Sequence, residues 1–179
     1  DAELIISFGG DGTFLHVARQ ILGMRIPLLG VNVGTKGFMA GLEPEDIELV
    51  RRAAAGDYRE SLRMMLDIEL HRADGEVIYD CALNDAVVKS DVNCINLAVH
   101  ADGPIVEPEA ANIIITPICA HIMAAKSFVL SPERTVTVIP ERLRGRRAVL
   151  SVDGSEGIQL ASGDEVRARW SGNTVIMAD

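Results

Sequence analysis

The chain begins with an apolar segment of strand length, Leu4–Phe8, which runs directly into a glycine-rich sequence at 9–12. A helical pattern follows, in which the apolar residues between Phe14 and Leu22 share one face and Gly23 marks the end. Ile26–Asn32 forms a second apolar run of strand length. This order predicts a βαβ unit, whose ligand site should lie at the carboxyl ends of its strands.

The next segments extend this α/β pattern. Val33–Phe38 is a second glycine-bearing loop, and it should face the same crevice as the first. Pro44–Ala55 predicts a helix, because proline is favoured at the first helical position, acidic residues follow it, arginines lie near the end and Gly56 comes after it. The buried face of this helix is expected to contain Ile47, Val50 and Ala54.

After about Tyr58 the apolar residues alternate with a period of two, which indicates strands. Leu66–His71 and Val77–Tyr79 flank a turn and predict a β-hairpin. Further short strands are expected at Ala86–Val88, Asn96–His100, Thr135–Ile139, Ala148–Val152, Glu165–Trp170 and Thr174–Met177. The predicted fold is therefore an α/β part at residues 1–57 followed by an all-β sandwich domain at residues 58–179.

Charge and cysteine content restrict the partners. A formal net charge of -9 over 179 residues argues against a nucleic acid or an anionic membrane as partner. The locally basic run Arg134–Arg147 is interpreted as a solvated turn. Three cysteines without a CxxC pair favour reduced thiols in a cytoplasmic protein. No apolar span is long enough to cross a bilayer, and the start inside an apolar strand suggests that further residues precede Asp1.

The glycine-rich sequence also contains a candidate for chemistry, Asp11. Glycines let the backbone approach a ligand closely, and the first N–H groups of a helix favour phosphate. A carboxylate in such a place repels phosphate, so Asp11 should have a task such as binding a metal or accepting a proton from a hydroxyl nucleophile. The alternative is that Asp11 only caps the helix.

Four motifs together resemble the NAD kinase family: GGDGTFL at 9–15, IPLLGVNVGTKGF at 26–38, ALNDAVV at 82–88 and ITPICAH at 115–121. The resemblance implies a Rossmann-like N-terminal part, truncated here, and a β-sandwich C-terminal part. It also implies phosphoryl transfer from ATP to the adenosine 2′-hydroxyl of NAD, giving NADP, with polyphosphate open as an alternative donor. Family members are usually cytoplasmic homo-oligomers, dimers or tetramers, that need a divalent cation such as Mg²⁺.

The resemblance also assigns roles by position. Asp11 would be the base that takes the proton of the 2′-hydroxyl, and Gly10 and Gly12 would contact the dinucleotide through the backbone. His16 lies where some relatives have a basic residue near the nucleotide; a surface histidine without a role is the alternative. No residue is assigned as a metal ligand.

Three more residues are assigned to the nucleotide. Phe38 matches a phenylalanine that packs beside it, against the alternative of core packing. Asn84 and Asp85 match the Asn-Glu or Asn-Asp pair that hydrogen-bonds the dinucleotide, whereas an Asn-Asp pair is otherwise common in turns.

The sequence departs from the family where a TPTGSTAY-like segment would hold the adenosine end of NAD. Nothing here matches that segment, and Asp102 is not assigned to the site. Lys36 also replaces a usually apolar residue. If the segment is merely missing, Gly103 and Pro104 should be far apart; a closed turn there would favour a non-catalytic dinucleotide-binding or assembly protein. A lipid or sugar kinase with GGDGT is a weaker third possibility.

Overall fold

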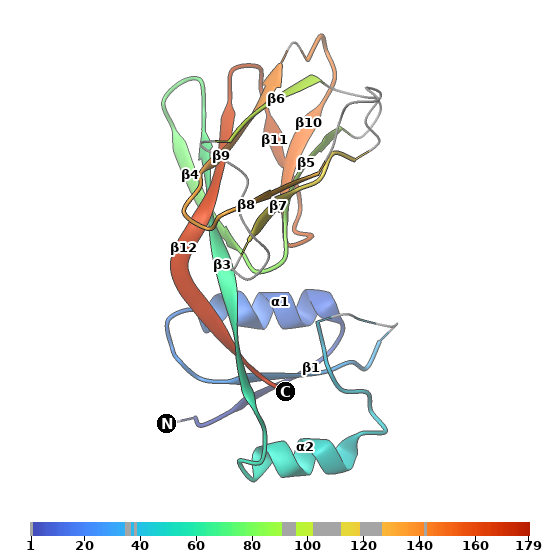
Figure 1. Cartoon of the computed structure of the whole chain (residues 1–179). Coiled ribbons are helices and arrows are strands. Elements are labelled where there is room, and N and C mark those ends of the chain that lie inside the picture. The colour runs from blue at the N-terminus through green and yellow to red at the C-terminus, as the bar shows by residue number, and fades with distance from the viewer. Residues whose placement is uncertain are drawn as a thin grey trace.

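The computed structural model describes residues 2–34, 37, 39–90, 96–101, 112–118, 127–141 and 143–179. These residues form two regions (Figure 1). The lower α/β region contains both helices and the first two strands, and the upper β region contains most of the later strands. Both ends of the chain lie in the lower region. The helices are α1 (Asp11–Gln20) and α2 (Ile47–Ala54). The strands are β1 (Ile5–Phe8), β2 (Leu28–Val31), β3 (Glu60–His71), β4 (Val77–Ala82), β5 (Ala86–Ser90), β6 (Asn96–Ala101), β7 (Ile113–Ile115), β8 (Phe128–Leu130), β9 (Val136–Glu141), β10 (Ala148–Val152), β11 (Ile158–Leu160) and β12 (Glu165–Ala178). Within the part of the chain that the structure describes, no helix is long and apolar enough to cross a membrane.

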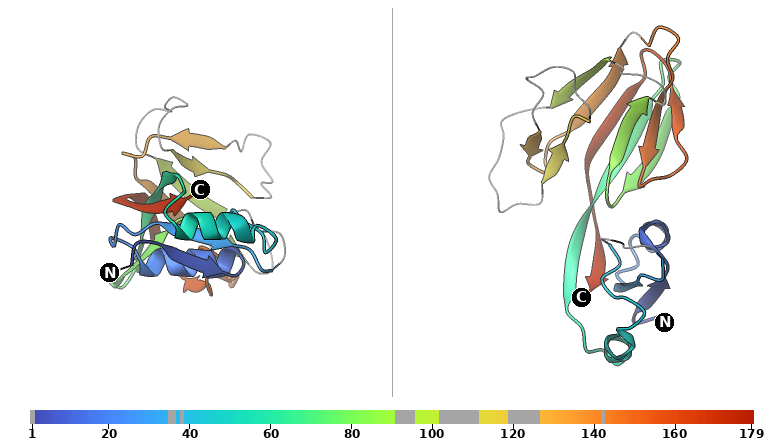
Figure 2. Two further views of the ribbon diagram at one scale, coloured as in Figure 1. Left: turned by 90° about the horizontal axis from the view of Figure 1, so that it is seen from below. Right: turned by 90° about the vertical axis from the view of Figure 1, so that its right-hand side faces the viewer.

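A seven-stranded sheet joins the two regions. Its main order is β1-β2-β12-β3-β4, with β9 beside β12 and β6 beside β9. β1 and β2 are parallel and α1 connects them, as the βαβ pattern predicts. The long antiparallel strands β3 and β12 run side by side from the upper to the lower region (Figure 2).

β12 changes neighbours along its length. Its first half, at 166–168, pairs with β9 on one side and with β3 on the other. The register shifts between Trp170 and Thr174, and beyond this irregularity Met177 pairs in parallel with Leu28 of β2. The C-terminal strand therefore belongs to both regions.

Each of the two regions is stabilised by hydrophobic clusters of its own. In the upper region the three-stranded sheet β11-β10-β5 packs on the large sheet, with Leu150 of the former against Ile68, Leu70 and Val166 of the latter. In the lower region the apolar face of α1 packs on the large sheet through Phe14, Ala18, Leu28, Met65 and Val175. The second cluster fixes the helix that begins at Asp11.

Several predicted elements need correction. The second helix begins at Ile47 and not at Pro44. Its buried residues are Val50 and Ala53, whereas Ile47 is 54% exposed and Ala54 is also exposed. The two strands predicted at 165–170 and 174–177 form the single strand β12, because the pairing with β3 resumes after the register shift. The strands β7, β8 and β11, of 3 residues each, were not predicted.

Candidate active site

The glycine-rich sequence forms the turn between β1 and α1. Gly10 is the extended N-cap residue of α1, and its carbonyl accepts the N–H groups of Thr13 and Phe14 at 3.0 and 3.1 Å. Asp11 is thus the first helical residue, and the capping interpretation of its side chain is wrong. A Cβ atom at Gly10 or Gly12 would meet nothing within 4 Å, so both backbones border open space. A ligand can therefore approach the chain closely at both positions.

The carboxylate of Asp11 is held by the loop that follows β2. Oδ1 of Asp11 accepts the backbone N–H of Met39 at 3.0 Å. Gly37 lies against the same carboxylate, because a Cβ atom there would be 2.5 Å from Oδ1. The two glycine-bearing loops therefore meet at Asp11, as expected for the carboxyl ends of adjacent parallel strands.

Asn32 shapes the start of this second loop. It is 1% exposed, and its side-chain oxygen accepts the N–H of Gly34 at 3.2 Å. Its amide nitrogen lies 3.3 Å from each carboxylate oxygen of Glu43. A buried amide with partners on both sides is costly to displace, so this network fixes where the loop leaves β2.

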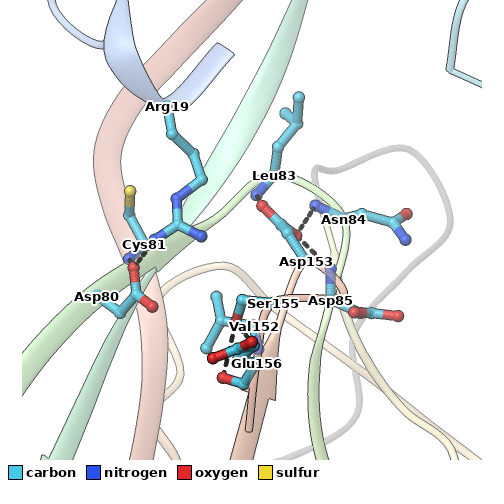
Figure 3. Close-up of polar contacts among 10 residues, drawn as sticks. All are labelled: Arg19, Asp80, Cys81, Leu83, Asn84, Asp85, Val152, Asp153, Ser155 and Glu156. Carbon is cyan, nitrogen blue, oxygen red and sulfur yellow. Dashed lines mark hydrogen bonds and ion pairs between the residues drawn. The ribbon is translucent and has the colours of Figure 1, made fainter. Parts of the chain in front are cut away.

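A half-open pocket of about 200 Å³ lies between α1 and the turn after β10. Gly12, Leu15, His16 and Arg19 line it from the helix. Asp153, Gly154 and Ser155 line it from the opposite side. Arg19 also forms an ion pair with Asp80 of β4, which connects α1 to the upper region (Figure 3).

The turn at 83–85, between β4 and β5, is attached to Asp153. Oδ2 of Asp153 accepts the N–H of Leu83 at 2.9 Å, and Oδ1 accepts those of Asn84 and Asp85 at 2.8 and 3.0 Å (Figure 3). Both Asn84 and Asp85 are exposed. Partial desolvation raises the pKa of the Asp85 carboxyl, and the negative charge of Asp153 raises it further, whereas Lys89 lowers it.

Two family models together match almost the whole chain. Residues 1–58 match the model of the ATP-NAD kinase N-terminal domain, and residues 58–178 match that of the C-terminal domain. The chain belongs to the NAD kinase family. The NAD kinase of Acetivibrio thermocellus is 32% identical over 202 residues, which covers 95% of this chain and 70% of that protein. The matched region is longer than the 179 residues of this chain. Within that region, the relative therefore has residues without a counterpart in this chain.

Two solved structures of the NAD kinase family share the fold. Yeast NADH kinase complexed with NADH has a TM-score of 0.82 at 21% identity, covering 99% of this chain and 61% of the yeast chain. An NAD kinase from Archaeoglobus fulgidus in complex with ATP has a TM-score of 0.70 at 23% identity, covering 99% and 78%. The chain thus spans less than two thirds of the yeast protein. The shared fold confirms the predicted fold class.

The structure brings some of the predicted residues of this NAD kinase family member together. Gly12 and His16 border the pocket, and Asp153 on its far side holds the backbone of Asn84 and Asp85. Neither Asn84 nor Asp85 is among the described residues that line the pocket. Five sequence candidates lie outside the described residues, as does the Gly103–Pro104 bond: Lys36, Phe38, Cys94, Asp102 and Cys119.

Two residues of the site were missed from the sequence, Asp153 and Arg19. The Asp-Gly pair at 153–154 between two strands was visible as a turn, but not as an anchor for residues near position 84. Arg19 falls on the polar side of the α1 pattern, where a solvated arginine is the ordinary expectation.

Proposed function

We propose that this chain catalyses phosphoryl transfer from ATP to the adenosine 2′-hydroxyl of NAD. The 2′-oxygen forms the new bond to the γ-phosphorus, the bond from that phosphorus to the bridging oxygen breaks, and ADP leaves. The observation that supports this best is the Asp11 carboxylate, held between two glycine loops at the start of α1 in a chain of the NAD kinase family. The named relative is an NAD kinase, and the two solved structures contain NADH and ATP.

In this proposal Asp11 is the catalytic base that receives the proton of the 2′-hydroxyl. The contact from Met39 holds one carboxylate oxygen and fixes the orientation of the other. A base fixed in this way is already oriented when the hydroxyl arrives, which favours proton transfer in the transition state.

The remaining predicted residues bind the nucleotides. Gly10 and Gly12 offer backbone next to open space, which suits a phosphate or ribose that must approach closely. His16, on the exposed face of α1 beside the pocket, would contact a nucleotide phosphate. Asn84 and Asp85 would hydrogen-bond the dinucleotide, and Phe38 would pack beside it.

In this proposal a divalent cation would arrive with the phosphates of ATP, not on a cluster of ligands among the described residues. Among them, no group of three or more His, Cys, Asp or Glu side chains could hold a metal ion. Mg²⁺ at nucleotide sites typically uses only one or two carboxylates and takes its other ligands from substrate phosphates and water. When bound, Mg²⁺ neutralises charge on the transferred phosphoryl group.

The deciding experiment incubates the full chain with NAD, ATP and Mg²⁺ and measures NADP with an NADP-specific dehydrogenase. A matched reaction contains an NAD analogue that lacks the 2′-hydroxyl of the adenosine ribose. This analogue can bind but offers no acceptor oxygen. NADP formation only from the complete substrate supports the proposal. No NADP under conditions in which NAD binds would contradict it and would favour the non-catalytic binder.

We also propose a cytoplasmic homo-oligomer, a dimer or a tetramer. Leu97 and Val99 share one face of β6 and are 37% and 45% exposed, and Ile114 of β7 is 64% exposed. Exposed apolar residues on edge strands suit contact with a second copy. A monomer by light scattering at micromolar concentration would count against the oligomer, and recovery in the membrane fraction after cell lysis would count against the location.

A further inference from the structure

One residue outside the predicted set holds the whole turn that contains Asn84 and Asp85. The carboxylate of Asp153 accepts three consecutive backbone N–H groups, at distances from 2.8 to 3.0 Å. In return, the backbone N–H of Asp153 donates to the carbonyl oxygen of Asp85 at 2.9 Å. Four hydrogen bonds thus join a single residue to the turn.

The backbone at Asp153 makes this arrangement possible. β10 pairs with β5 as far as Val152 opposite Ala86, and the chain then turns at Asp153 with φ of 49°. Aspartate and asparagine tolerate this left-handed conformation better than most residues. The side chain is thereby directed back over the start of β5, toward N–H groups that β-ladder pairing leaves unused.

The position of Asp153 connects this anchor to the candidate active site. The residue lines the pocket opposite Gly12, so it lies between the glycine-rich loop and the turn at 83–85. The negative charge of Asp153 raises the pKa of Asp85, because the two neighbouring carboxylates repel each other.

We propose that Asp153 is a positioning residue, which holds the turn at 83–85 so that Asn84 and Asp85 present their side chains to the dinucleotide. This inference rests on the proposed function, because it assumes that the turn binds NAD. Asp153 itself need not touch the substrate. Its loss should therefore weaken NAD binding more than it slows the chemical step.

The test uses two variants of the full chain. Asp153→Gly removes the carboxylate while keeping the left-handed backbone, which glycine adopts freely. Asp153→Asn keeps one oxygen that can accept the N–H groups of Asn84 and Asp85. Its side-chain NH₂ group, however, faces the backbone N–H of Leu83, and two donors cannot form a hydrogen bond. The dissociation constant for NAD is measured by calorimetry, and kcat and KM are measured from NADP formation.

We expect Asp153→Gly to raise the dissociation constant and the KM for NAD by about ten- to a hundredfold, since the freed N–H groups leave the turn without its anchor. The kcat should stay within about threefold, and Asp153→Asn should restore part of the affinity. The control is Asp164→Ala: Asp164 also accepts two backbone N–H groups and an arginine, but it is absent from the described pocket lining. That control should lower the thermal midpoint without changing NAD affinity.

Unchanged NAD affinity in both Asp153 variants, with NADP formed by the unsubstituted chain, would overturn the positioning role alone. The same holds if the variants lose only thermal stability, as the Asp164 control should. If the unsubstituted chain binds NAD but forms no NADP, the proposed function fails, while the dissociation constants of the variants still decide the role of Asp153. Should Asp153→Gly fail to fold, Asp153→Asn alone gives the answer.

Discussion

The two carboxylates of the site differ in how readily the sequence reveals them. Asp11 could be predicted because its signal is local: glycines, a strand and a helix adjoin it in the chain. Its contact with Met39, 28 positions away, could not. Asp153 was missed because its partners lie 68 to 70 positions earlier, and side-chain pairing over that distance leaves no pattern in a single sequence.

The role of Asp11 can be tested by removing its ability to take a proton. Asp11→Asn keeps the shape of the side chain, so NAD affinity should change by only a small factor while kcat falls roughly 10²–10⁴-fold. Steady-state NADP formation and calorimetric NAD binding measure the two effects. Asp74→Asn, in the exposed hairpin turn, is the matched control and should behave like the unsubstituted chain. Near-normal turnover of Asp11→Asn would refute the assignment.

The close contact between Gly37 and Asp11 gives a second prediction. Gly37→Ala would place a Cβ atom 2.5 Å from Oδ1 of Asp11, and the carboxylate or the loop must move to relieve the overlap. Because a small displacement of a catalytic group is costly, we expect kcat to fall by at least about tenfold. Gly41→Ala adds the same methyl group in open space and is the control. Equal turnover in the two variants would mean that the orientation of Asp11 is not critical.

At the scale of elements, the sequence located most helices and strands but misjudged their ends. Pro44 and the acidic residues after it resemble a helix start, yet the chain makes a turn in which Glu43 N–H bonds to Asp46, and the helix begins afterwards. β12 was predicted as two strands because Ser171–Asn173 resembles a turn. Pairing with β3 on both sides of this irregularity, a tertiary effect, makes it one strand.

Asp164 should stabilise the junction between the β3–β4 hairpin and the start of β12. It is 1% exposed and accepts hydrogen bonds from Ala161, Ala73 and Arg72. Burial alone would raise the pKa of its carboxyl, but these hydrogen bonds outweigh burial and the net pKa lies below the ordinary value. Asp164→Ala should therefore lower the free energy of unfolding by about 2–3 kcal/mol at pH 7.

The same carboxyl predicts a pH dependence. The pKa of Asp164 is lower in the folded chain than in the unfolded chain. Its contribution to the free energy of unfolding is therefore fully present above the unfolded pKa of about 3.9 and is lost as the pH falls through the folded pKa. Urea midpoints measured from pH 6 to pH 3 should thus fall more steeply for the unsubstituted chain than for Asp164→Asn. Glu76→Gln, in the same hairpin turn but exposed, should follow the unsubstituted chain. Parallel curves for the chain and Asp164→Asn would show that Asp164 does not contribute.

At the scale of the whole molecule, the sequence indicated an α/β part followed by a β part, but not how they are joined. The division at residues 57 and 58 stays a prediction, and it falls between α2 and β3. What could not be predicted is that β12 returns to pair with β2, because strand order between distant segments is set by tertiary packing. Together with the ion pair between Arg19 and Asp80, this pairing connects the two regions.

This shared sheet predicts that the two regions unfold together. The described helices, α1 and α2, both lie in the lower region and report on it through circular dichroism at 222 nm. Trp170, the single tryptophan, lies at the register shift of β12 and reports on the strand that both regions share. In urea, the midpoints from the two signals should coincide, since neither region keeps its sheet without β12.

If the site spans both regions as proposed, saturating NAD should raise both midpoints by the same amount. Two separate midpoints, or a rise with NAD in only one signal, would show that the regions are independent despite the common strand.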